Sequence, residues 1–412
     1  MYGLIGEKLG HSFSKEIHNQ LADYDYQLIE LSAEEFPRFM EAKEFDGINV
    51  TIPYKEAVIP YLDQLDKSAE AIGSVNTVVN QNGKLIGYNT DFDGLLYLLE
   101  VNNMEIHGKT VMILGTGGTS KTITAICREL GASQVYKVSR GGGIYFNYEQ
   151  AEELDDVQVI FNATPRGMYP NNYERPFNTS FYPNLESVID VVYNPLNTSM
   201  VLMSLAQGLN AVGGLEMLVA QAKRAAELFT GAVIPDRRNQ EIYLNLCREM
   251  QNIVFTGMPG CGKTTLGKQV AEQLHRPFVD IDEEIVKTAG KSIPEIFEQD
   301  GEDAFRKTEK ELIRKFAAQH GQVIAPGGGI VKDFSNIQAL QQNGMLLFID
   351  RPLELLTASE DRPLARSKEA IEKLHQERYH IYDRYCDGKI VNNSTLNRAL
   401  SEIMTLIKGG GQ

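Results

Sequence analysis

The chain carries two glycine-rich turns of different design, and each follows a run of residues typical of a buried strand. The first lies in VMILGTGGTSKT at 111–122, and the second lies in FTGMPGCGKTT at 255–265. A strand, a glycine turn and then a helix are the usual beginning of a βαβ unit with a parallel sheet. Because a whole domain's length of sequence separates the turns, they predict two α/β domains, each with its own phosphate-binding site.

Composition narrows the class of protein further. The chain has 412 residues, 42% hydrophobic and 23% charged, with a net charge of −15. It lacks an apolar run of ~18 residues, a secretory signal and clustered basic residues, so we expect a soluble cytoplasmic protein that binds neither membrane nor nucleic acid. The oligomeric state stays open between monomer and homodimer. Four cysteines are too widely spaced for a zinc knuckle and are expected as reduced thiols: Cys127, Cys247, Cys261 and Cys386.

Strand-like and helical runs alternate along almost the whole chain. The helical stretch NQEIYLNLCREM then leads directly into a second series of strands that begins at NIVFTG, so a domain boundary is expected at 247–252. The first glycine turn places Gly115, Gly117 and Ser120 at the positions of a G-x-G-x-x-G/A motif, which binds a dinucleotide pyrophosphate at a helix N-terminus. A tight turn without a ligand is the alternative. The next strand ends at Arg140 and not at an acid, which favours NADP over NAD.

Further segments of the first half occur in an order that resembles one enzyme family. They read LIGEKLGHSFSKEIHN, GINVTIPYKE, GSVNTVV, GYNTDFDG, FNATPRGM, VVYNP and GGLEMLVAQA. Together they resemble shikimate dehydrogenase over 1–248. The resemblance implies a substrate-binding lobe at 1–101, completed by helices within 214–249, and a Rossmann NADP-binding lobe at 102–213. It also implies the reduction of 3-dehydroshikimate to shikimate with NADP(H).

The same resemblance implies roles for individual residues. Lys55 and Asp91 would be the catalytic pair, which fits a ketone reduction because the developing oxyanion needs a proton donor and a cation. Taken singly, Lys55 and Asp91 could be solvated surface charges, and Ser14 could be a helix N-cap. The implied substrate-binding residues are Ser12, Ser14, Asn49, Thr51, Asn76, Tyr193 and Gln221. The implied cofactor-binding residues are Gly115, Gly117, Gly118, Ser139, Arg140, Asn162, Ala163, Thr164, Gly214 and Met217.

The second glycine turn satisfies the P-loop pattern G-x-x-x-x-G-K-[ST] between a strand and a helix. In such a loop the backbone amides of residues such as Gly257 and Gly262 surround phosphate, Lys263 spans the β- and γ-phosphates, and Thr264 ligates Mg²⁺. This half also contains FVDIDEEI, GEDAFRKTEKEL, APGGGI and SEDRPLARS, and with them it resembles shikimate kinase. The resemblance implies a P-loop α/β domain of the nucleoside monophosphate kinase-like type at 250–412.

Roles in the second half are again those that the resemblance implies. Asp280 would hold Mg²⁺ with Thr264, and Asp282, Lys263 and Arg362 would be catalytic. Singly, these residues have ordinary explanations as helix-capping acids and surface ion pairs. The implied nucleotide-binding residues are Gly257, Gly260, Gly262, Lys263, Thr264 and Thr265. The implied shikimate-binding residues are Arg306, Glu309, Gly327, Gly328, Gly329 and Arg378.

Three segments depart from the patterns of the two families. The second Rossmann strand ends in SRGGG, so Arg140 has no obvious second cation, and Lys15 follows the second serine where a proline is usual. The kinase-like half reads RPLA and lacks an arginine several residues earlier.

From the two resemblances together we predict a bifunctional enzyme of chorismate and aromatic amino acid biosynthesis that uses NADP(H), ATP and Mg²⁺. The alternatives are a shikimate or quinate dehydrogenase with a non-catalytic, ligand-binding kinase-like domain, or with a kinase of another specificity.

Overall fold

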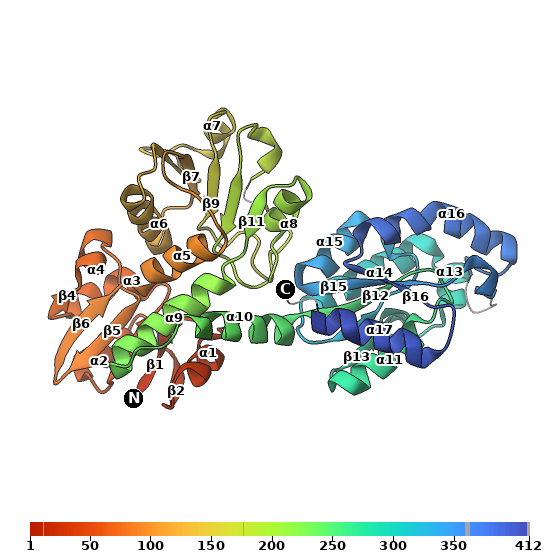
Figure 1. The fold of residues 1–412 in the computed structure, drawn as a ribbon, viewed down its shortest axis with the longest axis horizontal. Helices are drawn as coiled ribbons and strands as arrows, with labels where there is room; N and C mark the ends of the chain where they lie inside the picture. The colour runs from red at the N-terminus through yellow and green to blue at the C-terminus, as the bar shows by residue number, and fades with distance from the viewer. Residues whose placement is uncertain (11, 176, 359–362, 410–412) are drawn as a thin grey trace. The chain divides into compact units, whose positions relative to one another are not determined.

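The computed structural model describes residues 1–10, 12–175, 177–358 and 363–409 (Figure 1). The chain divides into two compact units, Met1–Asn245 and Leu246–Gln412, and the division falls within helix α10 (Arg237–Met250). Both units are α/β with parallel strands, as the sequence predicts. All four cysteines are free thiols, which confirms that expectation.

The first lobe of the first unit is built on a six-stranded mixed sheet with the order β2-β1-β3-β5-β6-β4. Its antiparallel hairpin turns at Asn82 and Gly83, whose φ angles of 53° and 87° are those of the left-handed turn that Asn-Gly adopts readily. The strands are β1 (Tyr2–Gly6), β2 (Tyr26–Glu30), β3 (Gly47–Val50), β4 (Gln64–Leu65), β5 (Thr77–Gln81) and β6 (Lys84–Tyr88). The helices are α1 (Ser14–Leu21), α2 (Glu35–Ala42), α3 (Tyr54–Ala57), the 3₁₀ helix Ile59–Tyr61, α4 (Lys67–Ile72) and α5 (Thr90–Val101).

The second lobe has a five-stranded parallel sheet with the order β11-β10-β9-β7-β8. Every residue of its interior strand TVMIL is buried, as expected for a parallel strand covered on both faces. The strands are β7 (Thr110–Leu114), β8 (Gln134–Val138), β9 (Val159–Asn162), β10 (Ser187–Asp190) and β11 (Asn210–Val212). The helices are α6 (Gly118–Glu129), α7 (Tyr148–Glu152), the 3₁₀ helix Thr179–Phe181 and α8 (Ser199–Ala206).

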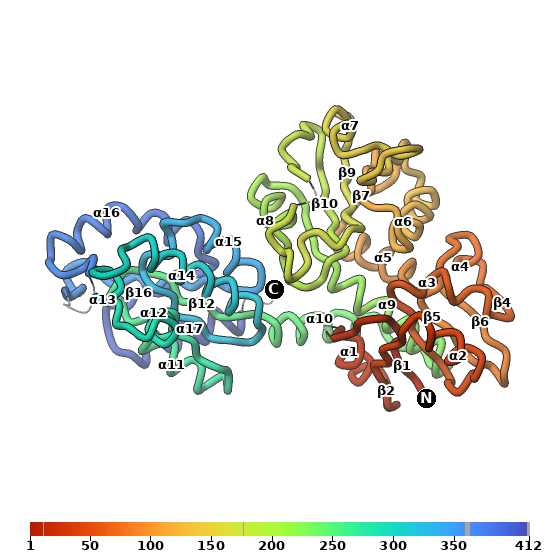
Figure 2. Tube along the Cα trace, turned by 180° about the vertical axis from the view of Figure 1, so that it is seen from behind, coloured from red at the N-terminus to blue at the C-terminus, as the bar shows by residue number. Residues whose placement is uncertain are grey.

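Helix α9 (Leu215–Thr230) returns the chain from the second lobe to the first and lies beside α5, as Figure 1 and Figure 2 show. Gly94 permits this close packing, because a Cβ at that position would lie 2.6 Å from the carbonyl oxygen of Met217. Farther along α9, Phe229 packs over Gly47 of β3, where an added Cβ would lie 2.4 Å from the ring. This packing places residues from three distant parts of the sequence around one site.

The second unit has a five-stranded parallel sheet with the order β13-β14-β12-β15-β16, so the strand before the P-loop is central. The strands are β12 (Asn252–Thr256), β13 (Phe278–Asp280), β14 (Val323–Ala325), β15 (Gly344–Asp350) and β16 (Gly388–Val391). The helices are α11 (Lys263–Leu274), α12 (Ile281–Ala289), α13 (Ile293–Gln299), α14 (Gly301–Ala317), α15 (Phe334–Asn343), α16 (Lys368–Tyr385) and α17 (Leu396–Gly409), with 3₁₀ helices at Ile330–Lys332 and Leu353–Leu355. Its strands run as buried apolar segments such as VIA and LLFI.

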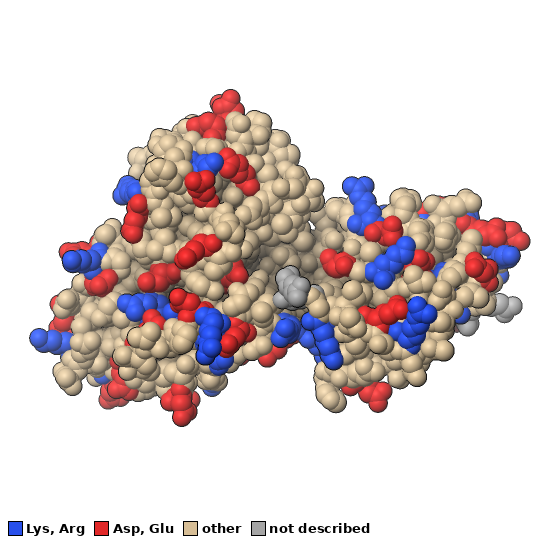
Figure 3. Space-filling view, in the orientation of Figure 1, with Lys and Arg blue, Asp and Glu red and all other residues tan. Residues whose placement is uncertain are grey.

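Acidic and basic side chains are interspersed over the face drawn in Figure 3. Among the helices that the structure describes, none combines the length and apolar character needed to span a bilayer.

Candidate active sites

Lys55 and Asp91 form an ion pair in the first unit, with 2.6 Å between Nζ and Oδ2. Lys55 lies in the short helix α3, and Asp91 lies in the first turn of α5. Their side chains are only 17% and 10% exposed, so water screens this pair much less than a surface pair. The structure thus brings together the two residues that the resemblance assigns to catalysis, and they are not solvated surface charges.

Asn76 connects this ion pair to a group of buried polar side chains. Its Nδ2 donates to Asp91 Oδ1 at 2.9 Å, and it lies 3.1 Å from Thr90 Oγ1 and 3.3 Å from Gln221 Oε1. Gln221 comes from α9, and its own Nε2 donates to the carbonyl of Leu218. Three residues with implied roles therefore share one hydrogen-bonded cluster, and Thr90 is a member that the sequence analysis missed.

The two serines near the N-terminus also lie together. Ser12 Oγ donates to Ser14 Oγ at 3.0 Å. Ser14 is the first residue of α1, whose N-cap position is occupied by Phe13 without a side-chain capping bond. The explanation of Ser14 as an N-cap is therefore wrong. The ring of Phe13 packs edge-on against Tyr193, with 6.0 Å between centroids, which places this tyrosine beside the serine segment. Thr51 directly follows β3, and its Cγ2 closely approaches Gly6.

The first glycine turn has the backbone that its motif requires. Gly115 has a φ of 106°, and a Cβ there would lie 3.0 Å from the carbonyl oxygen of Ala163. Gly117 is the N-cap of α6 and makes no side-chain cap, so the helix presents backbone N–H groups of the kind that bind phosphate. A Cβ on Gly118 would lie 3.6 Å from Cδ of Lys55. The turn is therefore adjacent to the Lys55–Asp91 pair.

The segment after β9 is held by an acid that the sequence analysis missed. Asp190 Oδ1 accepts from Asn162 Nδ2 at 2.9 Å, and Asn162 Oδ1 in turn accepts from the backbone and hydroxyl of Thr164. Burial raises the pKa of Asp190 to about 7, although Thr198, Val192 N and Asn162 all donate to it. The sequence gives no sign of this contact to Asn162, because an acid at the end of a buried strand can have many roles.

Gly214 and Met217 lie where the second lobe leads into α9. Gly214 is the N-cap of α9, and a Cβ there would lie 2.2 Å from the carbonyl oxygen of Val191, so only glycine fits. Met217 is buried in the first turn of the helix, 7% exposed, and belongs to the core under the parallel sheet.

Arg140 and a second cation, Arg166, both act on Tyr148. Arg140 is exposed after β8, next to Ser139, whose hydroxyl donates to the carbonyl of Gly142. Burial raises the pKa of Tyr148, and the positive charges of Arg166 and Arg140 both act against this shift. The guanidinium carbon of Arg166 also lies 5.2 Å from the centre of the Tyr148 ring. Arg166 thus contacts Tyr148, and Arg140 is near enough for its charge to act on the same tyrosine, whereas the sequence indicates no partner for Arg140.

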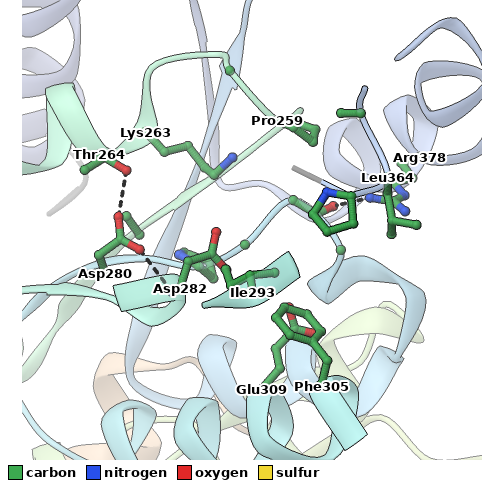
Figure 4. Close-up of a pocket in the computed structure, with 18 of the residues that line it drawn as sticks. Pro259, Lys263, Thr264, Asp280, Asp282, Ile293, Phe305, Glu309, Leu364 and Arg378 are labelled. Atoms are coloured by element: carbon green, nitrogen blue, oxygen red, sulfur yellow. Dashed lines mark hydrogen bonds between the residues drawn. The ribbon is translucent and has the colours of Figure 1, made fainter. Parts of the chain in front are cut away.

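In the second unit, the P-loop has the left-handed glycines that surround a phosphate site. Gly257, Gly260 and Gly262 have φ angles of 139°, 80° and 104°. Lys263 Nζ donates back to the carbonyl oxygens of Gly257 and Met258 at 2.9 and 3.1 Å. Thr264 Oγ1 donates to Asp280 Oδ2 at 2.7 Å (Figure 4). The structure therefore brings together the hydroxyl and carboxylate to which a Mg²⁺ role was assigned, and these oxygen donors fit that metal.

Asp280 has a second role, since its other oxygen accepts from the backbone N–H groups of Asp282 and Glu283 and caps α12. Asp282 follows in the first turn, and an added Cβ on Gly327 would lie 2.7 Å from its Oδ1. Asp280 is therefore a helix-capping acid, as the ordinary explanation has it, and its other oxygen is bonded to Thr264 at the same time. Asp282 extends to the same cavity (Figure 4).

A cavity of about 290 Å³ connects the P-loop to the remaining residues with implied roles. It is lined by Gly260 and Gly262 of the loop, Lys263, Thr264, Thr265, both aspartates, Arg306, Glu309, Gly327 to Gly329 and Arg378, but not by Gly257. Ile293, Phe297 and Phe305 add an apolar wall that the sequence analysis missed. Polar and charged groups around one concave site are suited to a small anionic ligand beside a nucleotide.

Arg306 is held by two carboxylates, with Nη1 2.8 Å from Glu309 Oε2 and Nη2 3.1 Å from Glu302. The other oxygen of Glu309 is buried without a hydrogen-bond partner among the described residues, and burial raises the pKa of Glu309. Arg378 donates to the carbonyl of Gly328 at 3.0 Å, and the hydroxyl of Tyr382 donates to the same oxygen. Glu302 and Tyr382 were missed, although each lies one helical turn from an assigned arginine. Arg362 lies outside the described residues.

The two sites define the class of protein as a two-lobed dinucleotide-binding enzyme joined to a P-loop kinase. Comparison with family models agrees with this division. Residues 4–78 match the shikimate dehydrogenase substrate binding domain, and residues 259–408 match shikimate kinase.

Individual relatives cover the first unit. Shikimate dehydrogenase (NADP(+)) of Clostridium beijerinckii is 36% identical over 259 residues, which cover 59% of this chain and 96% of that protein. The crystal structure of shikimate dehydrogenase 1 from Peptoclostridium difficile is 34% identical with a TM-score of 0.57, covering 60% of this chain and 97% of that one. The structure of shikimate 5-dehydrogenase from Thermus thermophilus in complex with NADP(H) and shikimate is 27% identical with a TM-score of 0.54. The match covers 59% of this chain and 98% of that one. The chain belongs to the shikimate dehydrogenase family and carries a shikimate kinase domain at its C-terminal end.

Proposed function

We propose that the chain catalyses two consecutive reactions, the reduction of 3-dehydroshikimate to shikimate with NADPH and the phosphorylation of shikimate with MgATP. The observation that carries this proposal is the convergence of the motif residues. Lys55 and Asp91 lie beside the dinucleotide turn, and the P-loop shares one cavity with Asp282 and Arg306. The joint presence of both family matches in one chain supports the order of the two reactions, because the product of the first is the substrate of the second.

In the reductase, bound NADPH supplies the hydride, and the protein handles the proton and the charge. The Lys55 ammonium donates a proton to the carbonyl oxygen and stabilises the negative charge that develops there. Asp91 fixes the ammonium through the 2.6 Å contact, and Asn76 fixes Asp91. Ser12 and Ser14 bind the substrate carboxylate, while Thr51, Asn76, Tyr193 and Gln221 contact the ring side. Arg140, with Arg166 as a second cation near Tyr148, would hold the 2′-phosphate of the cofactor.

In the kinase, the P-loop amides and Lys263 would bind the phosphates of ATP, and Thr264 and Asp280 would hold Mg²⁺. Asp282 accepts the proton of the attacking hydroxyl. Arg306 and Arg378 bind the carboxylate of shikimate against the glycines at 327–329, and Glu309 orients Arg306 through their 2.8 Å ion pair. Arg362 is assigned to the transferring phosphoryl group by resemblance alone.

A coupled assay tests both halves of this proposal. The full-length protein is given 3-dehydroshikimate and NADPH, and loss of the absorbance of NADPH is followed. ATP and Mg²⁺ are then added, and ADP release is measured. We expect one NADPH oxidised and one ADP formed for each molecule of shikimate 3-phosphate. Reduction without ADP release would instead support a non-catalytic, ligand-binding kinase-like domain.

A further inference from the structure

A chain of buried hydrogen bonds connects β2 to the catalytic pair. It begins at Tyr26, which is fully buried and whose hydroxyl donates to Asn49 Oδ1 at 2.7 Å. Asn49 Nδ2 donates to Thr77 Oγ1 at 2.9 Å, and Thr77 Oγ1 lies 3.1 Å from Thr90 Oγ1. Thr90 is within 3.3 Å of Gln221 Oε1 and precedes Asp91 in α5. We call Tyr26, Asn49, Thr77 and Thr90 the buried polar chain.

The direction of each bond in this chain is determined by its first member. The Tyr26 hydroxyl donates to Asn49 Oδ1, and burial raises the pKa of Tyr26 well above its ordinary value, so this proton is kept. Asn49 must therefore accept with Oδ1, which turns its amide nitrogen toward Thr77. Because Thr77 accepts that bond, its single hydroxyl proton is left for Thr90 Oγ1 or Asn76 Oδ1.

The far end of the buried polar chain holds residues to which substrate contacts are assigned. Asn76 Oδ1 accepts from the backbone N–H of Thr90 at 2.7 Å, which leaves Asn76 Nδ2 to donate to Asp91. Thr90 Oγ1 lies 3.2 Å from Asn76 Oδ1 as well as near Gln221. A reversal of the Asn49 amide would draw the Thr77 proton away from this cluster, and Asn76 would lose part of what fixes its orientation.

The ring of Tyr26 is also fixed in place. It stacks on His18 with 3.9 Å between centroids and an interplanar angle of 7°. Burial lowers the pKa of His18 to about 3, so the imidazole is neutral at physiological pH. Tyr24 lies in the same aromatic cluster, but its hydroxyl contacts His18 Nδ1 at 2.6 Å and not the buried polar chain.

We propose that Tyr26, Asn49 and Thr77 are positioning residues of the reductase, which fix the orientation of Asn76 and thereby the geometry of the Lys55–Asp91 pair. This inference rests on the proposed reduction. It assigns Asn49 a role different from the substrate contact that the resemblance implies, because Asn49 is only 4% exposed and its amide already bonds to Tyr26, Thr77 and the Asn76 carbonyl.

Thr77→Val and Thr77→Ser in the full-length protein provide the sharpest test. Valine keeps the shape of the side chain and removes the hydroxyl, whereas serine keeps the hydroxyl. A misplaced catalytic group costs up to ~10²-fold in rate, so we expect Thr77→Val to lower kcat of reduction by ~10–10²-fold and Thr77→Ser to restore most of it. The kinetic isotope effect with NADPH deuterated at the transferred position should rise in Thr77→Val, because the chemical step becomes slower.

Tyr26→Phe and Tyr24→Phe form the matched pair for the start of the chain. Each removes one hydroxyl from the same aromatic cluster, and only Tyr26 belongs to the buried polar chain. We expect Tyr26→Phe to lower kcat by ~3–30-fold and Tyr24→Phe to leave it within ~2-fold, on the same argument from geometry. Thermal midpoints of both variants and the kinase activity of the same preparations report any loss of folded protein.

The outcomes separate this inference from the proposed function. If Tyr26→Phe and Thr77→Val lower the thermal midpoint while kcat and the isotope effect stay at wild-type values, the residues are structural only and the inference is overturned. The same holds if Thr77→Ser is as slow as Thr77→Val. If the wild-type protein fails to reduce 3-dehydroshikimate, the proposed function has failed instead.

Discussion

The two lysines that face phosphate-binding turns have different partners. Lys55 of the first unit is already bonded to the carboxylate with which it is proposed to act, at 2.6 Å. Lys263 of the second unit donates instead to two carbonyl oxygens of its own loop. The reductase site is therefore preformed, with its charges paired and its amides oriented. The kinase site must exchange internal contacts for contacts with its ligands.

The carboxylates of the two sites differ in the same way. Asp91 has both oxygens bonded, one to Lys55 and one to Asn76. Glu309 has one oxygen on Arg306 and one buried without a partner among the described residues. A buried unpaired oxygen costs free energy, and a ligand hydroxyl in the cavity would relieve that cost. The comparison predicts that removing a proposed catalytic group causes a large loss of activity in its own unit only. Removing a group that supports it should have a smaller effect.

The largest expected effect is that of Lys55→Ala on the reductase. Removing a positioned proton donor should slow reduction by ~10²–10⁴-fold and leave phosphorylation unchanged. Lys43→Ala is the matched control, because Lys43 forms an exposed ion pair with Asp63 in the same lobe. Steady-state rates of NADPH oxidation and ADP release measure both. Equal loss of the two activities would mean that the variant is misfolded or that the assignment is wrong.

Lys263→Ala should have the next largest effect. Loss of a cation at the transferring phosphoryl group should slow ADP formation by ~10²–10³-fold, while reduction stays at the wild-type rate. Lys268→Ala lies on the same helix and removes an exposed pair with Glu283, so it controls for general changes in charge. ADP formation that persists in Lys263→Ala would contradict the proposed role of the P-loop.

A smaller effect is expected for the arginines beside Tyr148. A hydrogen bond to a charged group is worth ~1.5–3 kcal/mol, so Arg140→Ala should weaken binding of 2′,5′-ADP by ~10–100-fold and of 5′-AMP much less. Arg166→Ala should act in the same direction and less strongly, because Glu174 partly offsets its charge at 3.9 Å. Calorimetric titration measures both ligands without turnover, and the control is Arg38→Ala, which removes an exposed arginine of α2 in the first lobe. Unchanged discrimination would place NADP specificity elsewhere.

The sequence predicts the turns and the class of fold well, for a physical reason. Positions such as Gly115 and Gly262 need left-handed backbone that few other residues adopt, so the motif directly reports the conformation. The hydrophobic pattern of TVMIL similarly reports a strand buried on both faces. These features are local, and local features leave a signal in the sequence.

Contacts between distant residues leave no such signal. Spacing alone does not bring Lys55 to Asp91, and only the resemblance suggested that pair. Arg166 and Arg140 follow different strands, β9 and β8, and the sequence does not display that both charges act on Tyr148. Tyr26 and Thr77 read as ordinary strand residues, since tyrosine and threonine are frequent in strands whatever their hydroxyls contact.

The smallest expected effect concerns Asp190, a buried acid that supports the cofactor segment. Burial raises its pKa from 3.8 to about 7, so between these values the folded protein holds a proton that the unfolded chain has lost. The contribution of this group to stability is therefore present at low pH and falls as the pH rises toward 7.

Asp190→Asn removes this titration and can keep the same contacts. Its amide oxygen can accept from Asn162 and from the backbone N–H of Val192, while its amide nitrogen donates to Thr198. We expect the thermal midpoint of the first unit, identified by its increase with NADPH, to rise in Asp190→Asn relative to wild type between pH 5 and pH 8. A difference between the two proteins that is the same at every pH would show that Asp190 is ionised throughout, stabilised by its three donors.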